Sequence, residues 1–234
     1  MAIGDGANDV NMINSAHIGV GVRGIEGSQA TRAADYVISE FKHLKRLVLF
    51  YGINFYHRNC GVILYTLYKN ILVTFPILFY GPLSIESAVF IYEMWIFQCY
   101  NILFTAVPIV YFGLFDTIYT EKQMISKPYL YGEGQQGEYF NRWILLRQII
   151  TTIVSSIFLV VTSYEITNLT ILENGLIAYE SWAGMLVFNV VVVTVNIRIW
   201  NMSNQISVLQ GIICLFSIGS YYLVFFLIEI LFYT

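Results

Sequence analysis

The segment Ala2–Ile13, AIGDGANDVNMI, places two carboxylates and an amide close together near the N-terminus. Its glycines let the backbone turn sharply after a short apolar strand, so Asp5 is expected at the carboxyl end of a sheet, where α/β proteins bind phosphates. The hard oxygens of Asp5 suit Mg²⁺, the Asn8 amide can hydrogen-bond a phosphoryl oxygen, and Asp9 can position its neighbours. This pattern predicts phosphoryl-transfer chemistry. The alternative is that Asp-Gly only forms a turn and Asn-Asp only caps a helix.

A second candidate group surrounds Lys69, which lies near the middle of the apolar stretch GVILYTLYKNILVTFPILFY. A lysine at the centre of a membrane helix costs about 2.5 to 3.5 kcal/mol, so it is expected to face a partner or a wet cavity. The polar residues expected to line such a cavity are Asn70, Gln98, Asn101 and Thr105. The alternative for these four is hydrogen bonding between helices, which contributes about 0.6 kcal/mol per bond.

Most of these residues must be positioned by membrane helices. The chain has 234 residues, of which 57% are hydrophobic and 12% charged, with a mean hydropathy of +0.66. Soluble domains carry about 25% charged residues, so an ordinary soluble protein is excluded. Five apolar stretches are long enough to cross a bilayer, at about 61–80, 91–112, 143–163, 182–199 and 208–232. The expected fold class is therefore a mainly α, multi-pass membrane helix bundle of about five transmembrane helices.

The residues before the bundle differ in character. Residues 1–41 are mixed and glycine-rich, with the alternation of apolar residues and glycines that is typical of soluble α/β structure. One or two strands with two helices cannot bury a core alone, so this piece is expected to be an incomplete α/β domain. Residues 42–60 predict a helical stalk, and residues 61–234 predict the transmembrane bundle.

The distribution of basic residues predicts the orientation of the spans. Six of the twelve lysines and arginines precede the first span and four lie in or just after the loop at 113–142, whereas the connections at 81–90 and 164–181 contain none. Because basic residues are retained on the cytoplasmic side, the N-terminus and the 113–142 loop are expected in the cytoplasm. The net charge of -3 gives no reason to expect nucleic acid as a partner.

Two prolines fall inside predicted spans, Pro76 in the first and Pro108 in the second. Each removes a backbone hydrogen bond and is expected to kink its helix. Such a kink is tolerated in a membrane when neighbouring groups satisfy the freed carbonyl.

Several motifs resemble one known family. GDGAND at residues 4–9 resembles the hinge motif in the phosphorylation domain of P-type ATPases, and three further stretches are similar to the type-IV branch, the phospholipid flippases. These stretches are residues 19–52, YKN at 68–70 and NILFTAVPIVYFGLFD at 101–116. PYLYGEGQ at 128–135 and TVNIRI at 194–199 add weaker support, so the resemblance covers essentially the whole chain. It implies a haloacid-dehalogenase-like phosphorylation domain at the N-terminus. It also implies an ATP-driven enzyme that moves phospholipid from the exoplasmic to the cytoplasmic leaflet through an aspartyl-phosphate intermediate.

The resemblance also implies roles for individual residues. Asp5 corresponds to the Mg²⁺ ligand, with Asp9 counted in the same metal site, and Asn8 and Asp9 support the phosphate site. Lys69, Asn70 and Asn101 correspond to residues along the substrate path. The implied cofactor is Mg²⁺, with ATP as substrate in the complete enzyme. The implied partners are a phospholipid and a glycosylated two-pass accessory β-subunit, in the plasma membrane or an endomembrane.

The sequence departs from the family pattern in one respect. It contains no DKTGT motif, the motif that carries the phosphorylated aspartate in this family. We therefore expect a C-terminal part of a flippase that is inactive by itself, whether it comes from a truncated gene model, a degenerate copy or a genuine short product. The alternative is a non-catalytic membrane interaction protein derived from a flippase. An ion-pump fragment is disfavoured, because the second and fourth spans lack an acidic cluster that would coordinate cations.

Overall fold

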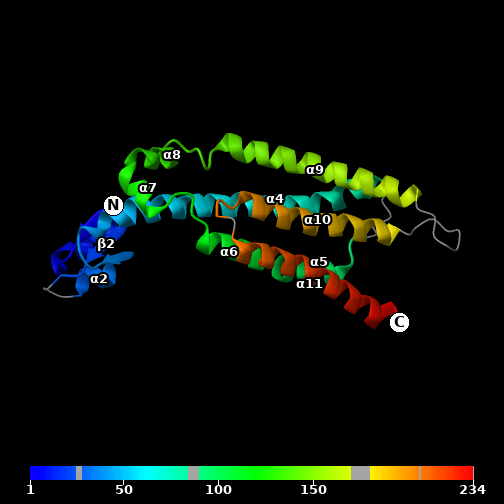
Figure 1. Cartoon of the computed structure of the whole chain (residues 1–234), viewed down its shortest axis with the longest axis horizontal. Coiled ribbons are helices and arrows are strands. Elements are labelled where there is room, and N and C mark those ends of the chain that lie inside the picture. Colours follow the sequence, from blue (N-terminus) through cyan, green and yellow to red (C-terminus); the bar gives the residue numbers. More distant parts are fainter. Residues whose placement is uncertain (25–27, 84–89, 170–179, 206, 234) are drawn as a thin grey trace. The chain divides into compact units, whose positions relative to one another are not determined.

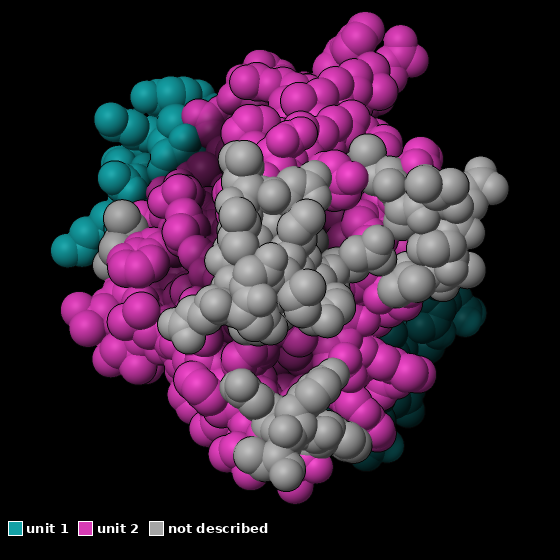
Figure 2. Space-filling view, turned by 90° about the vertical axis from the view of Figure 1, so that its right-hand side faces the viewer, with its two compact units in different colours: residues 1–55, 119–132 teal, residues 56–118, 133–234 magenta. Residues whose placement is uncertain are grey.

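The computed structural model describes residues 1–24, 28–83, 90–169, 180–205 and 207–233. The chain divides into two compact units, which are coloured separately in Figure 2. The first unit comprises residues 1–55 and 119–132, and the second comprises residues 56–118 and 133–234. The elements of both are labelled in Figure 1.

The first unit contains a small parallel sheet. Its strands are β1 (Ala2–Gly4), β2 (Gly19–Val22) and β3 (Tyr36–Ile38), in the order β1-β2-β3. The connections are helical: η1 (Ala7–Asp9) and α1 (Val10–Ser15) join β1 to β2, and α2 (Gln29–Ala33) precedes β3. Strands joined through helices pair in parallel, which confirms the α/β character expected for this part of the chain.

The other elements of the first unit come from two distant parts of the sequence. They are α3 (His43–Arg46), the π-helix η2 (Leu47–Gly52), α7 (Glu121–Ser126) and η4 (Pro128–Tyr131). An ion pair joins the Arg46 guanidinium to the Glu121 carboxylate at 3.0 Å. The side-chain amide of Asn54 donates to the backbone oxygen of Tyr119 at 3.3 Å. These two contacts attach the 119–132 segment to residues 43–55.

The remaining helices confirm the predicted membrane bundle. They are α4 (Ile53–Leu83), α5 (Met94–Cys99), α6 (Ala106–Phe115), α9 (Arg142–Leu169), α10 (Glu180–Met202) and α11 (Val208–Tyr233), with the short α8 (Gly132–Gln135) before α9. Within the described residues, five helical stretches are long and apolar enough to cross a membrane. They are His43–Pro82, Met94–Phe115, Arg142–Ile166, Gly184–Met202 and Val208–Ile228.

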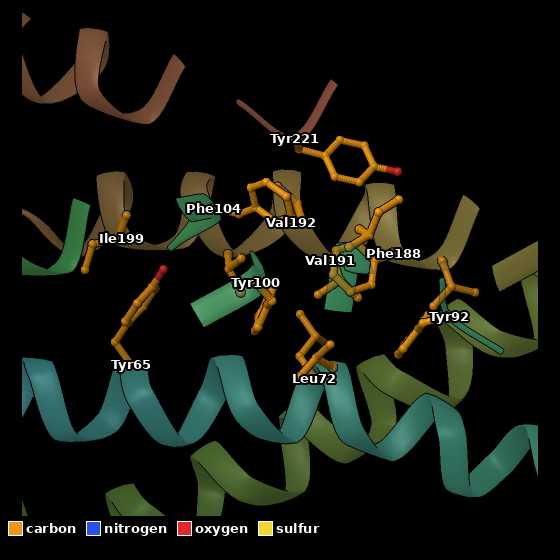
Figure 3. Packing of buried hydrophobic residues seen from close by; sticks show 14 of the residues in the cluster. Tyr65, Leu72, Tyr92, Tyr100, Phe104, Phe188, Val191, Val192, Ile199 and Tyr221 are labelled. Atoms are coloured by element: carbon orange, nitrogen blue, oxygen red, sulfur yellow. The ribbon is translucent and has the colours of Figure 1, made fainter. Parts of the chain in front are cut away.

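An aromatic cluster forms the core of the second unit. Figure 3 shows Tyr65 and Leu72 on α4 extending toward α10, which contributes Phe188 and Ile199. The Phe188 ring packs edge-on against the Tyr100 ring, with the ring centroids 5.7 Å apart. Such edge-to-face pairs contribute about 0.5 to 1.5 kcal/mol beyond burial of their area. The cluster therefore joins α4, the second span and α10 into one core.

The second span is interrupted rather than continuous. A π-helical segment, η3 (Tyr100–Phe104), separates α5 from α6, and Thr105 has a non-helical backbone conformation. Pro108 has no N–H, so it cannot donate to the backbone oxygen of Phe104 four residues earlier. That oxygen instead accepts a hydrogen bond of 3.1 Å from the Asn196 side chain on α10. The expectation that a neighbour satisfies the carbonyl freed by Pro108 is confirmed.

Candidate functional site

The predicted phosphate and metal site lies in the first unit, at the carboxyl end of β1. Asp5 directly follows the strand and is exposed, as is Asn8. The Asp9 carboxylate turns back toward the chain, where its Oδ2 accepts hydrogen bonds from the backbone N–H of Asp5 at 3.0 Å and of Gly6 at 3.2 Å. A side chain at Gly4 would collide with Asp9, so glycine is required there for this close approach. Asp9 thus stabilises the turn, as the alternative interpretation allowed.

The residues of this turn remain compatible with Mg²⁺. No group of three or more histidine, cysteine or acidic side chains suited to a metal was found among the described residues. Mg²⁺ is usually held by one or two carboxylates together with water and substrate phosphate, so an exposed Asp5 at a strand end fits that ion. Bound there, Mg²⁺ would neutralise phosphate charge. Asp9 Oδ2 is already used by two backbone N–H groups, so Asp5 is the better-placed ligand.

The second candidate site is a buried ammonium group in the bundle. The Lys69 side chain on α4 is buried, with 6% of its surface exposed. Its Nζ donates to Asn101 Oδ1 at 2.9 Å and to Thr105 Oγ1 at 2.8 Å. Both acceptors lie on the interrupted span, within or directly after the π-helical segment η3. Two of the four predicted neighbours therefore contact Lys69.

The other two predicted neighbours of Lys69 lie elsewhere. Asn70 and Gln98 are exposed, and neither is among the hydrogen-bond partners of Lys69. Adjacent residues on a helix point in directions about 100° apart, so Asn70 cannot face the same partners as Lys69. Asn70 was also assigned to the substrate path by family resemblance, and that role stays a prediction.

Among the described residues, no carboxylate pairs with Lys69. The ion pairs formed between described residues do not include Lys69, and both of its acceptors are neutral. Asn101, unlike Thr105, is exposed, so one side of the site reaches the surface of this unit. A charged donor beside an exposed amide suits a ligand with phosphate or carboxylate oxygens.

The sequence did not single out Tyr100, which also contacts Lys69. Its hydroxyl donates to the backbone oxygen of Lys69 at 3.0 Å, and its ring centroid lies 5.7 Å from Lys69 Nζ. Its own backbone oxygen accepts from the Thr105 hydroxyl at 3.0 Å. A tyrosine within an apolar run is typical of a core residue, so only its position next to Asn101 could have drawn attention to it.

A third polar group lies where α6 ends and was also not predicted. The Asp116 carboxylate is buried, and its Oδ1 accepts from the backbone N–H of Asn204 at 2.9 Å and of Gln205 at 3.1 Å. Its Oδ2 accepts from the Asn204 side chain at 3.2 Å and lies 3.8 Å from His57 Nδ1. Asp116 thereby joins the end of α6, the connection between α10 and α11, and α4. The signal was present in the sequence as the last residue of the stretch ending FGLFD.

The chain is similar to known proteins over most of its length. A family model described as "Phospholipid-translocating P-type ATPase C-terminal" matches residues 31–234. The chain is 36% identical over 226 residues to phospholipid-transporting ATPase IC of Xenopus tropicalis and 35% identical over 226 residues to the human protein of the same name, each covering 93% of this chain. It is 45% identical over 141 residues, 60% of the chain, to a phospholipid-transporting ATPase of Schizosaccharomyces pombe. The chain spans only 11% to 18% of the length of these relatives.

Proposed function

Because the chain belongs to the phospholipid-translocating P-type ATPases, we propose that it forms the C-terminal part of an ATP-driven flippase. That enzyme would move phospholipid from the exoplasmic to the cytoplasmic leaflet through an aspartyl-phosphate intermediate. The observation that carries the proposal is the Lys69 site, where a buried ammonium lies beside a helix break in a multi-pass membrane bundle. A buried ionisable residue at membrane depth is a functional site by default.

The proposed role of Lys69 follows from charge. A phospholipid headgroup crossing the bilayer carries a phosphate whose charge must be stabilised away from water. The Lys69 ammonium can provide that stabilisation, and the exposed Asn101 amide can donate a further hydrogen bond to the phosphate. The family resemblance also assigns Asn70 to this substrate path. Its side-chain amide is exposed, which suits a contact with the moving lipid.

The proposed role of the N-terminal turn is to hold charge at the phosphorylation site. Asp5 would bind Mg²⁺, Asn8 would hydrogen-bond a phosphoryl oxygen, and Asp9 would fix the turn through the backbone N–H groups of Asp5 and Gly6. The phosphorylated aspartate, the ATP site and an accessory β-subunit would belong to the rest of the complete enzyme and its complex.

A hybrid enzyme tests the proposal. In it, this chain replaces the matching residues of phospholipid-transporting ATPase IC, expressed together with that enzyme's accessory subunit. We expect the hybrid to take up fluorescent phospholipid and to show lipid-stimulated ATP hydrolysis, and Asp5→Ala to abolish both. A hybrid that inserts normally and forms phosphoenzyme but never moves lipid would favour the non-catalytic interaction protein.

The isolated chain, in contrast, is expected to hydrolyse no ATP. Phosphoryl transfer in this family needs an aspartate nucleophile within a DKTGT motif, which the sequence does not contain. The measurement is phosphate release by the purified chain with Mg²⁺ and added phospholipid. Release above that of a matched Asp5→Ala preparation would contradict the expectation.

The orientation of the spans is part of the proposal. With the N-terminus in the cytoplasm, Glu165 near the end of the third span faces the exoplasm and Glu138 before that span faces the cytoplasm. In a variant without the native cysteines, we expect a cysteine at 165 to react with an impermeant maleimide in intact cells. A cysteine at 138 should react only after permeabilisation, and the reverse pattern would overturn the orientation. Residue 173 lies in the connection that is predicted to face the exoplasm, but it is outside the described residues.

A further inference from the structure

Tyr100 contacts both the backbone oxygen and the ammonium group of Lys69. The tyrosine hydroxyl donates to the Lys69 backbone oxygen at 3.0 Å, while the ring lies beneath the ammonium with 5.7 Å between the centroid and Nζ. A cation above an aromatic face is attracted by the ring, and more strongly where water is excluded. Tyr100 itself is held in place, because it is 1% exposed and packs against the Phe188 ring on α10.

The backbone oxygen of residue 100, which is present whatever side chain stands there, orients the Thr105 hydroxyl toward Lys69. The Thr105 hydroxyl donates its proton to the Tyr100 backbone oxygen at 3.0 Å, so its oxygen lone pairs face the incoming ammonium, which donates at 2.8 Å. A hydroxyl has one proton to give, and its direction is fixed by this bond. The same π-helical segment presents Asn101, the other acceptor of Lys69. The Lys69 ammonium, the Thr105 hydroxyl and Tyr100 thus form a closed set of contacts across α4 and the interrupted span.

We infer that Tyr100 is a positioning residue for Lys69, holding the ammonium at the helix break where a lipid phosphate would meet it. Tyr100 acts through Lys69 and has no contact with the lipid itself. The functional half of this inference rests on the proposed flippase activity. The positioning half concerns only the geometry of this chain.

The positioning half is tested on the chain itself by NMR. The chain has five lysines, so lysine labelled with ¹³C at Cε gives few signals in detergent micelles, and Lys69→Met identifies the signal of Lys69. We expect Tyr100→Phe, which keeps the ring and removes the hydroxyl, to move that signal. The matched control is Tyr65→Phe, one helical turn before Lys69 on α4. Tyr65 is fully buried, and its hydroxyl has no hydrogen-bond partner among the described residues. An unmoved Lys69 signal in Tyr100→Phe would overturn the inference.

The functional half is tested in the hybrid enzyme by a double-mutant cycle. Tyr100→Phe is expected to lower lipid-stimulated turnover about fivefold, the factor for one lost hydrogen bond, while leaving phosphoenzyme formation unchanged. Combined with Lys69→Met, it should add nothing, because its effect passes through the ammonium. Additive losses, or full turnover in Tyr100→Phe, would overturn the inference. Full turnover in Lys69→Met would instead refute the proposed role of Lys69 and the functional half, leaving the NMR result to decide the positioning half.

Discussion

Replacing Lys69 by methionine in the hybrid enzyme should lower lipid-stimulated ATP hydrolysis by at least about tenfold, or about 1.4 kcal/mol of transition-state stabilisation. The substitution removes the charge between Asn101 and Thr105 and leaves a side chain of similar length. Phosphoenzyme formed from ATP should stay near the parent level, because the phosphorylation chemistry belongs to other residues. The measurements are the phosphoenzyme level and turnover over a range of phospholipid concentrations.

The matched control for this experiment is Lys122→Met. Lys122 is exposed on α7 in the first unit, so the same change of charge and shape occurs at an exposed position. It should leave turnover within about twofold, as expected for surface substitutions. If Lys69 served only the structure, its replacement would relieve the cost of burying a charge, and transport would be unchanged or improved. Unchanged or improved transport would therefore show that Lys69 has a purely structural role.

Asp116→Ala should produce the largest loss of stability among single substitutions in the polar groups described above. The carboxylate accepts three hydrogen bonds from Asn204 and Gln205, two of them from backbone N–H groups. Alanine leaves those donors without an acceptor in a buried place, at a cost of about 2 to 4 kcal/mol. The measurement is chemical unfolding of the purified chain in detergent micelles, followed by circular dichroism.

Two further variants make the Asp116 result specific. Asp116→Asn keeps one carbonyl oxygen as an acceptor, so its loss should be smaller than that of alanine. Glu165→Ala removes an exposed carboxylate and should change the unfolding free energy by no more than about 0.5 kcal/mol. Equal unfolding curves for Asp116→Ala and Glu165→Ala would show that the buried carboxylate contributes no stability.

The sequence predicted what depends on local properties. Five spans follow from the length and apolarity of each stretch, and these features are independent of how the helices pack. The α/β character of the N-terminal residues was predicted from glycines alternating with apolar residues, whereas the third strand and the parallel pairing were not predicted. The neighbours of Lys69 were predicted only in part, because a list of polar residues in the spans does not give the direction of each side chain. Asn101 and Thr105 meet Lys69, whereas Asn70 and Gln98 do not.

What the sequence did not predict depends on long-range contacts. The Asn196 side chain donates to the backbone oxygen of Phe104, 92 residues away, and Asp116 accepts from donors 88 and 89 residues away. Hydrophobic periodicity carries no information on such pairs. The turn at Asp5 to Asp9 is a different case, since its residues serve the local backbone and the proposed phosphate chemistry at once. Its geometry therefore supports both interpretations.

The π-helical segment η3 affects the orientation of the helix that follows it. A π-turn accommodates an extra residue, and each residue of an α-helix turns the chain by about 100°. If η3 closed to a regular α-helix with the same number of residues, α6 would rotate by about that angle. Phe112, whose ring lies 2.7 Å from where a Cβ on Gly61 would be, would then turn away from α4. The wide turn therefore sets the rotation of α6, and with it the contact between Phe112 and α4.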